Sequence, residues 1–260
     1  MRDTDVDRYL ERLQLAAPRV ADADALVRLQ HAHLLNVPFE NLSIHWAEPM
    51  ALSVDHGFRK IVDARRGGFC YECNGLFAAL LQALGFPTTL LSARVVRSDG
   101  SLGPEFDHLV LLVALETPWL VDVGFGHSFR TPMPLVDGRV QPEPGGDHRL
   151  VHADGRWILE GGTSEGAWSA RFTFETTPRR LEAFRGMFEF HRDSPDSHFH
   201  RAPLATIATA GGRTTLSGRR LIRTTLDGHR AEEDVAEDDV PPVLAREFGI
   251  VRGRQSSPAR

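Results

Sequence analysis

The chain has 260 residues, of which 42% are hydrophobic, and its formal net charge is −5 at pH 7. This length suits one large domain or two or three smaller ones, with enough apolar residues to fill a sizeable core. The acidic balance argues against a general nucleic-acid binder, which normally presents a basic face. The chain contains no stretch of about 18 apolar residues, so no membrane span is predicted.

The N-terminal segment does not have the pattern of a secretory signal. Its first residues, MRDTDVDRYLERLQLAAPRV, are charged throughout rather than basic and then apolar. The chain has 2 cysteines, too few for a disulfide framework. We therefore expect a cytoplasmic protein that binds neither nucleic acid nor membranes.

The N-terminal part of the chain has the periodicity of helices. Asp5 is placed to cap a first helix whose Tyr9, Leu10 and Leu13 share one face. A second helix is predicted over 21–37 and ends at Pro38, and a short one over 55–68 runs into a pair of glycines. The most regular pattern, over 72–84, predicts an amphipathic helix that stops at Gly85 and Pro87.

After Pro87 the pattern changes to that of strands. Alternating or continuous apolar runs predict five strands and therefore an antiparallel sheet or barrel, at 88–97, 106–115, 119–125, 149–160 and 170–177. Asp154 and Gly155 predict a hairpin turn inside the fourth run.

The C-terminal part mixes helix and strand signals. A short helix is predicted over 178–190, further strands over 202–226, and a last helix over 238–250 that is capped near Asp239. The acidic run at 232–239 is interpreted as a solvated face or loop, and 251–260 as a mobile tail.

Cys70 and Cys73, within RRGGFCYECNG, admit several interpretations besides that of two small buried hydrophobes. A redox pair is expected after a strand in a βαβ pattern, whereas the preceding segment here is helical and loop-like. A zinc site needs two further ligands, and His198 and His200, expected on one side of a strand, are the close histidine pair outside the first helices. Zinc is thus permitted but not required, and we predict no metal.

The remaining interpretation makes Cys70 a nucleophile. Two glycines allow a close backbone approach, and Cys70 then lies at the N-terminus of the amphipathic helix, where free amide groups stabilise a thiolate. His108 and Asp122 each interrupt an apolar run, and burying either is costly unless it has a partner. On adjacent antiparallel strands they can pair, so Cys70, His108 and Asp122 form a candidate triad.

These segments resemble the arylamine N-acetyltransferases in motif and in order. The similarity runs from about residue 5 to about residue 250 and rests on four blocks: VPFENLSI (37–44), RGGFCYECNGLF (66–77), FDHLVLLV (106–113) and WLVDVGFG (119–126). Cys73 departs from the family pattern, but it lies outside the triad.

The resemblance implies an α+β fold with a cysteine-protease or transglutaminase-like core. It implies a helical domain over 1–86 that carries the cysteine, a β-barrel domain over 87–190 that carries the histidine and aspartate, and an α/β lid over 191–260 with its mobile tail.

The resemblance also implies acetyl-CoA-dependent acetylation of arylamines and hydrazines by a ping-pong mechanism. Cys70 is then the acetyl-accepting nucleophile, His108 its base and Asp122 the orienting acid. Acetyl-CoA is the acyl donor and no metal takes part. The resemblance suggests that Phe125, and more weakly Phe39 and Val95, contact the amine, while backbone amides near Gly124 and Gly126 can meet the CoA pyrophosphate.

Two alternatives remain open from the sequence. The same triad order serves papain-like and transglutaminase-like enzymes, so another cysteine acyltransferase or an amidohydrolase is the nearest one. A non-catalytic binding protein of the same fold is the other, and it is disfavoured because none of the triad residues is missing.

Overall fold

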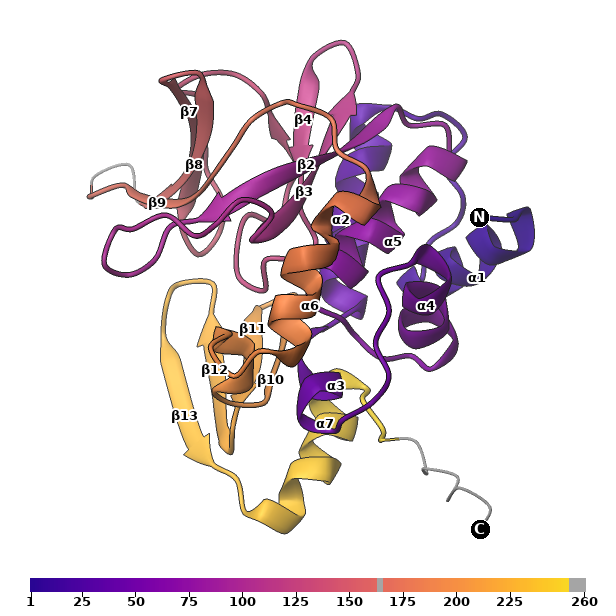
Figure 1. The fold of residues 1–260 in the computed structure, drawn as a ribbon, viewed down its shortest axis with the longest axis vertical. Helices are drawn as coiled ribbons and strands as arrows, with labels where there is room; N and C mark the ends of the chain where they lie inside the picture. Colours follow the sequence, from indigo (N-terminus) through magenta and orange to yellow (C-terminus); the bar gives the residue numbers. More distant parts are fainter. Residues whose placement is uncertain (163–165, 253–260) are drawn as a thin grey trace.

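The computed structural model describes residues 1–162 and 166–252. Helices come first, an eight-stranded sheet follows, and a five-stranded sheet with a last helix forms the C-terminal end (Figure 1). Most of the predicted mobile tail, residues 253–260, lies outside the described residues.

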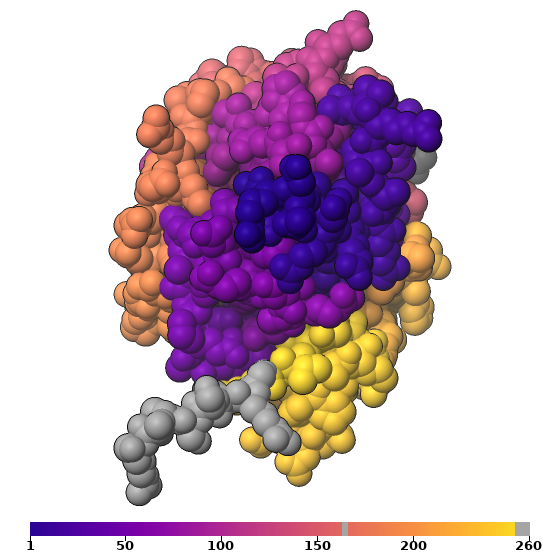
Figure 2. Space-filling view, turned by 90° about the vertical axis from the view of Figure 1, so that its right-hand side faces the viewer, coloured from indigo at the N-terminus to yellow at the C-terminus, as the bar shows by residue number. Residues whose placement is uncertain are grey.

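The N-terminal helices pack around α5. They are α1 (Asp3–Leu13), α2 (Ala23–Asn36), α3 (Leu42–His45), α4 (Val54–Phe58), a π-helical turn (Arg59–Asp63) and α5 (Cys70–Ala83). The predicted cap position differs slightly, because α1 begins at Asp3 and Asp5 lies in its first turn, where its carboxylate accepts from the Arg2 backbone N–H at 3.1 Å. Figure 2 shows this helical face, with the C-terminal segment below it.

The middle of the chain forms an antiparallel sheet that curls into a nearly closed barrel. Its order is β5-β4-β3-β2-β9-β8-β7-β6. The bounds are β2 (Thr88–Val95), β3 (His108–Ala114), β4 (Pro118–Val121), β5 (Met133–Pro134), β6 (Val140–Gln141), β7 (Asp147–Ala153), β8 (Arg156–Gly162) and β9 (Ser169–Phe174). The predicted barrel is therefore confirmed, and the β7–β8 turn has positive φ at Asp154 and Gly155, as expected.

Strand β3 joins the helical core to the barrel. Its Leu109, Leu111 and Val113 belong to the apolar cluster around α5, whereas Val110 packs with the barrel interior. This alternation follows from the two-residue period of a strand. Because His108 shares the face of Val110, its side chain is directed toward the barrel while its backbone lies beside α5.

The second sheet has the order β1-β10-β11-β12-β13. Its strands are β1 (Phe39–Glu40), β10 (Leu204–Thr209), β11 (Gly212–Ser217), β12 (Arg220–Thr225) and β13 (Arg230–Asp234), followed by a 3₁₀ turn (Glu237–Asp239) and α7 (Val240–Phe248). The sequence did not predict that β1 joins this sheet. It also did not predict a strand at the start of the acidic run, where β13 is exposed at every residue.

Between the sheets lie a 3₁₀ turn (Leu181–Phe184), α6 (Arg185–Asp193) and a second 3₁₀ turn (His198–His200). The expectation that His198 and His200 lie on a strand was wrong, because Ser197 caps a helical turn there by accepting from the Phe199 N–H. The proposed division at residues 86 and 190 stays a prediction, and its second boundary falls inside α6.

Candidate active site

The two glycines before Cys70 lie against the chain that forms β1. Gly68 N–H donates to Pro38 O at 3.3 Å, and the Glu40 N–H donates to Gly68 O at 3.0 Å. A Cβ atom at Gly67 would come within 2.0 Å of Pro38 O, a distance no side chain tolerates. The close approach predicted from the glycine pair is thus present, and it fixes the path of the chain into α5.

A buried ionic network holds the start of α5. Lys60 Nζ contacts Glu72 Oε2 at 2.8 Å and Glu40 Oε1 at 3.7 Å, and Arg66 Nη2 contacts Glu40 Oε1 at 2.8 Å. Burial alone would raise the pKa of Glu40, but Lys60 and Arg66 outweigh it and the pKa lies below its ordinary value. Glu72 also accepts from the Phe69 N–H at 3.2 Å, so the network caps the first turn of α5.

Cys70 is the first residue of α5 and is 3% exposed. Burial raises the pKa of its thiol well above the ordinary value, although hydrogen bonding to the backbone of Leu109 acts in the opposite direction. The helix N-terminus favours a thiolate, so it acts against the effect of burial. Cys70 therefore needs a neighbouring base to lose its proton at neutral pH.

His108 and Asp122 form a buried pair, as the sequence predicted. His108 Nε2 lies 2.8 Å from Asp122 Oδ2, and the two residues are 3% and 2% exposed. The His108 ring also packs edge-on against Phe125 with centroids 5.1 Å apart. Since Nε2 donates to the carboxylate, Nδ1 is the ring nitrogen left to accept a proton.

Asn74, one turn after Cys70, joins the helix to both strands. Its Nδ2 donates to Leu109 O at 2.7 Å and to Asp122 Oδ1 at 2.8 Å, and its Oδ1 accepts from the Val123 N–H at 2.9 Å. The Gly124 N–H donates to Asp122 Oδ1 at 2.7 Å. With His108 on its other oxygen, the Asp122 carboxylate receives three hydrogen bonds, which fix its orientation.

Gly124 lies directly against the nucleophile helix. A Cβ atom there would come within 2.7 Å of both Cys70 Cα and Asn74 Nδ2. The absence of a side chain at this position is what allows the end of β4 to approach the first turn of α5. This contact brings the segments of Cys70 and Asp122 together.

A cavity of about 600 Å³ is linked to His108 through Phe125, whereas Cys70, His108 and Asp122 are not among its described lining residues. Phe125, Phe39 and Gly126, three of the predicted substrate and cofactor contacts, line it, and Phe125 is the residue that also touches His108. Val95 and Gly124 are not among its described lining residues. The size of this cavity is suited to a small organic molecule.

Basic side chains line the part of the cavity formed with the second sheet. They include Arg130, which lies between β4 and β5, Arg213 in β11 and Arg230 in β13. Burial and the nearby Arg130 lower the pKa of Arg213 to about 10, and its Nε has no hydrogen-bond partner among the described residues. These groups favour an anionic ligand in that part of the cavity.

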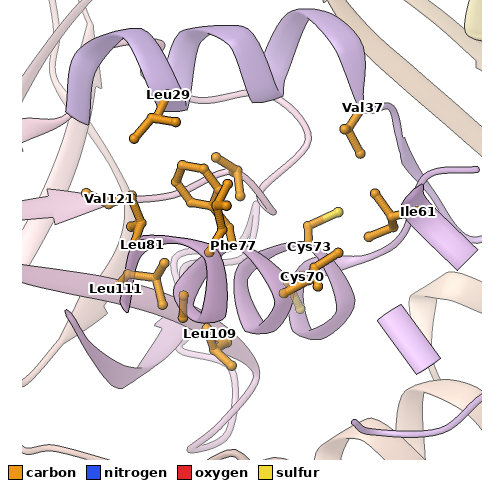
Figure 3. Packing of buried hydrophobic residues seen from close by; sticks show 14 of the residues in the cluster. Leu29, Val37, Ile61, Cys70, Cys73, Phe77, Leu81, Leu109, Leu111 and Val121 are labelled. Carbon is orange, nitrogen blue, oxygen red and sulfur yellow. The ribbon is translucent and has the colours of Figure 1, made fainter. Parts of the chain in front are cut away.

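Cys73 occupies a different environment from Cys70. Both thiols are free, and Figure 3 shows the Cys73 sulfur on the side of α5 that faces Val37, with the Cys70 sulfur on another side. Cys73 Sγ donates to Gly68 O at 3.2 Å, and burial raises the pKa of this thiol well above its ordinary value. Cys73 is therefore an inert core residue in this arrangement.

Sequence reasoning missed Asn74 and the arginines of the cavity. Asn74 carried a usable signal, because it is a polar residue four positions after Cys70 and therefore on the same face of the predicted helix. Arg130 and Arg213 carried none, because they meet only through the packing of two sheets.

Two further observations concern cofactors and membranes. Within residues 1–162 and 166–252, no group of three or more His, Cys, Asp or Glu side chains is arranged to hold a metal ion. Over the same residues, no helix combines the length and apolar character needed to cross a bilayer.

Comparison with known proteins identifies the family. The sequence profile described as N-acetyltransferase matches residues 22–256. The arylamine N-acetyltransferase of Mycolicibacterium smegmatis is 36% identical over 261 residues, which cover 96% of this chain and 93% of that protein. This chain belongs to the arylamine N-acetyltransferase family. The resemblance inferred from the four sequence blocks is thereby confirmed, and the protein is an acetyltransferase.

Solved structures of the family share the whole fold. The Salmonella typhimurium arylamine N-acetyltransferase superimposes with a TM-score of 0.92 at 29% identity, covering 98% of this chain and 95% of the other. The Mycobacterium marinum enzyme in complex with CoA superimposes with a TM-score of 0.87 at 31% identity, covering 94% and 92%. The predicted α+β architecture is confirmed by this agreement.

Proposed function

We propose that this protein transfers the acetyl group of acetyl-CoA to arylamines and hydrazines through an acetyl-Cys70 thioester. Cys70 is the nucleophile, His108 the proton carrier and Asp122 the group that orients His108. The observation that carries the proposal is the buried His108–Asp122 pair, 2.8 Å long, which Asn74 joins to the helix that begins with Cys70.

The His108–Asp122 pair supplies the base that the Cys70 thiol needs. Because burial raises the pKa of the thiol, attack requires transfer of its proton to His108 as the sulfur approaches a carbonyl carbon. Asp122 holds the Nε2–H tautomer, so that Nδ1 accepts this proton, and its negative charge stabilises the imidazolium that forms.

The chemistry divides into two half-reactions. In the first, Cys70 Sγ bonds to the acetyl carbon, the bond to the CoA sulfur breaks, and His108 returns the proton to the departing CoA thiolate. In the second, the amine nitrogen attacks acetyl-Cys70, His108 takes a proton from that nitrogen, and the Cys70 thiolate leaves and receives this proton from His108. CoA departs before the amine enters, which gives ping-pong kinetics.

The cavity supports a place for both substrates. Phe125 offers aromatic surface next to His108, and Phe39 lines the same cavity, which suits the ring of an arylamine. Arg130 and Arg213 supply positive charge for the phosphates of CoA, a ligand seen in the related Mycobacterium marinum structure. Val95 as an amine contact and Gly124 and Gly126 as CoA contacts stay predictions, as does the cytoplasmic location.

Intact-protein mass spectrometry tests the proposal directly. The reduced protein is incubated briefly with acetyl-CoA without an amine, in parallel with Cys70→Ala and Cys73→Ala. We expect one added acetyl group in the wild type and in Cys73→Ala, none in Cys70→Ala, and loss of the group when an arylamine or a hydrazine is added.

The same experiment separates the alternatives. A folded, reduced wild type that takes up no acetyl group would refute the CoA-dependent route and favour an amidohydrolase or a binding protein. Equal loss of labelling in Cys70→Ala and Cys73→Ala would instead indicate that both thiols take part.

A further inference from the structure

The residue after the nucleophile is hydrogen-bonded to the residues before the base. The Tyr71 hydroxyl donates to Phe106 O at 2.7 Å and lies 3.2 Å from Asp107 O. Tyr71 is 1% exposed. Burial raises the pKa of its hydroxyl well above the ordinary value, so the group remains a neutral donor.

The turn that receives these hydrogen bonds is strained. Phe106 has φ of 65°, in the left-handed region that non-glycine residues rarely occupy. Its N–H donates to Ser92 Oγ at 2.8 Å, so both polar backbone groups of Phe106 are bound to side chains. A strained conformation persists only where its surroundings fix it, and strain of this kind collects near functional sites.

The position of His108 depends on this turn. Asp107 O belongs to the peptide group that contains the His108 nitrogen, and β3 begins at His108 itself. His108 itself pairs with Ala93 of β2, so the strand ladder holds the base on one side and this turn holds it on the other. The Tyr71 hydroxyl contacts the turn directly before His108, and Tyr71 itself follows Cys70 in the chain.

We propose that the Tyr71 hydroxyl is a positioning group that sets the placement of His108 relative to Cys70. The inference rests on the proposed roles of these two residues and adds a third residue that acts through the base without touching substrate. One side chain thereby couples the first turn of α5 to the entry of β3.

The ring of Tyr71 is held independently of its hydroxyl. It packs against Phe69, Phe184 and Phe188 with centroids 5.2, 5.9 and 6.1 Å away. His191, which lies 3.3 Å from Asp107 Oδ1, covers another side of the ring. Because these contacts remain in Tyr71→Phe, that variant removes the hydrogen bonds and keeps the packing.

The chain provides a matched control. It has 2 tyrosines, and the other, Tyr9, is 0% exposed with a hydroxyl that has no hydrogen-bond partner among the described residues. Tyr9→Phe therefore makes the same chemical change in an equally buried place without releasing the turn.

The test combines two measurements on the full chain. One is the rate of Cys70 acetylation in a single turnover, followed by mass spectrometry at several acetyl-CoA concentrations. The other is the pH dependence of Cys70 alkylation by iodoacetamide, with His108→Gln as the reference for an absent base. Thermal unfolding of each variant monitors the fold.

We expect Tyr71→Phe to slow the maximal acetylation rate by about tenfold with little change in the half-saturating acetyl-CoA concentration. Its alkylation profile should shift toward that of His108→Gln, because a displaced base pairs less well with the thiolate. Tyr9→Phe should match the wild type in both measurements. A purely structural role would alter thermal unfolding without moving the alkylation profile. The Tyr71 hydroxyl also interacts with the Cys70 side chain, and a direct effect on that thiol would persist when Tyr71→Phe is combined with His108→Gln, whereas an effect exerted through the base would not.

Two results would overturn the inference. A folded Tyr71→Phe with wild-type rate and profile would show that the hydroxyl does not position the base, while acetylation of the wild type would leave the proposed function intact. If Tyr71→Phe does not fold, Ser92→Ala releases the other side of Phe106, and a folded Ser92→Ala with wild-type behaviour overturns the inference equally. Absence of acetylation in the wild type and in Tyr9→Phe identifies failure of the proposed function itself.

Discussion

Replacing Asp122 by asparagine tests which nitrogen of His108 takes the proton of Cys70. In the wild type, Asp122 Oδ1 accepts from Asn74 Nδ2 and from the Gly124 N–H, while Oδ2 accepts from His108 Nε2. Both neighbours of Oδ1 are donors, so the single amide oxygen of the variant side chain is held on that side. Its NH₂ group then faces His108 Nε2.

This orientation reverses the tautomer of the base. Nε2 must accept the amide hydrogen bond, so the ring proton moves to Nδ1, the nitrogen that should receive the thiol proton. The same change in a serine-protease triad lowers kcat by about 10,000-fold, which corresponds to about 5 kcal/mol of transition-state stabilisation. We expect a loss of this order in the rate of Cys70 acetylation.

The assay is rapid-quench mass spectrometry of the acetyl-enzyme at saturating acetyl-CoA. Asp137→Asn is the matched control, because Asp137 is exposed and its Oδ1 accepts the backbone N–H of His152. The free energy of unfolding of Asp122→Asn should fall by no more than about 1–3 kcal/mol, since the two hydrogen bonds to Oδ1 remain and the one to His108 is kept with its direction reversed. Slowing by less than about tenfold in a folded variant would refute the tautomer argument.

Three further predictions follow from buried groups. Cys73→Ala should leave turnover with arylamine unchanged, because Cys73 lies outside the triad. It should lower the free energy of unfolding in urea by about 1 kcal/mol, because it removes a packed sulfur. A large loss of turnover would contradict the assignment of Cys73 as an inert thiol. Arg213→Gln should raise the KM for acetyl-CoA by about tenfold with little effect on kcat, since a charged hydrogen bond contributes in both ground and transition states; an unchanged KM would argue against phosphate binding there. Burial lowers the pKa of His33 to about 3 from the ordinary 6.5. The unfolded chain therefore binds a proton that the folded chain does not, so stability falls as pH decreases from 6.5 toward 3, by about 2 kcal/mol at pH 5. Urea titrations from pH 7 to pH 5 should lose this slope in His33→Leu, and an equal slope in both proteins would show that His33 is not its source.

The triad residues could be predicted because each breaks a local pattern. Cys70 follows two glycines at the start of a helix, and His108 and Asp122 each interrupt an apolar run. Burial of an ionisable group is costly without a partner, so such interruptions carry information that needs no knowledge of the fold. The structure brings His108 and Asp122 to 2.8 Å, while their catalytic roles stay a prediction.

The elements that sequence reasoning missed lack such local signals. Strand β13 is exposed at every residue, so it has no apolar alternation to reveal it. Strand β1 has two residues and joins β10 across more than 160 positions of sequence, where Phe39 pairs with Thr206. A strand pairing of this kind is decided by tertiary packing, because two residues contain too little pattern to specify a partner.

The predicted domain boundaries at residues 86 and 190 differ in how clearly the sequence marks them. Composition changes clearly at Pro87, where helices give way to strands, and the structure changes there as well. Near residue 190 the sequence offers only a helix followed by a polar loop. In the structure, α6 crosses that position and contributes Phe188 and His191 to the packing around Tyr71, so the segment is tied to the nucleophile helix.

The cavity illustrates why net charge is a poor guide to a ligand site. A formal charge of −5 argued against nucleic acid, yet it could not reveal that Arg130 and Arg213 line one cavity. They converge because Arg130 donates to Thr209 O and Gly212 O, across the hairpin that carries Arg213. One arginine is thus held by backbone carbonyls, and the other keeps a buried, unpaired Nε beside the cavity. Two cations repel each other at close range, and Glu143, which lines the same cavity beside Arg130, offsets only part of the positive charge of Arg130, Arg213 and Arg230. An anionic ligand such as the phosphates of CoA would therefore be stabilised at this position.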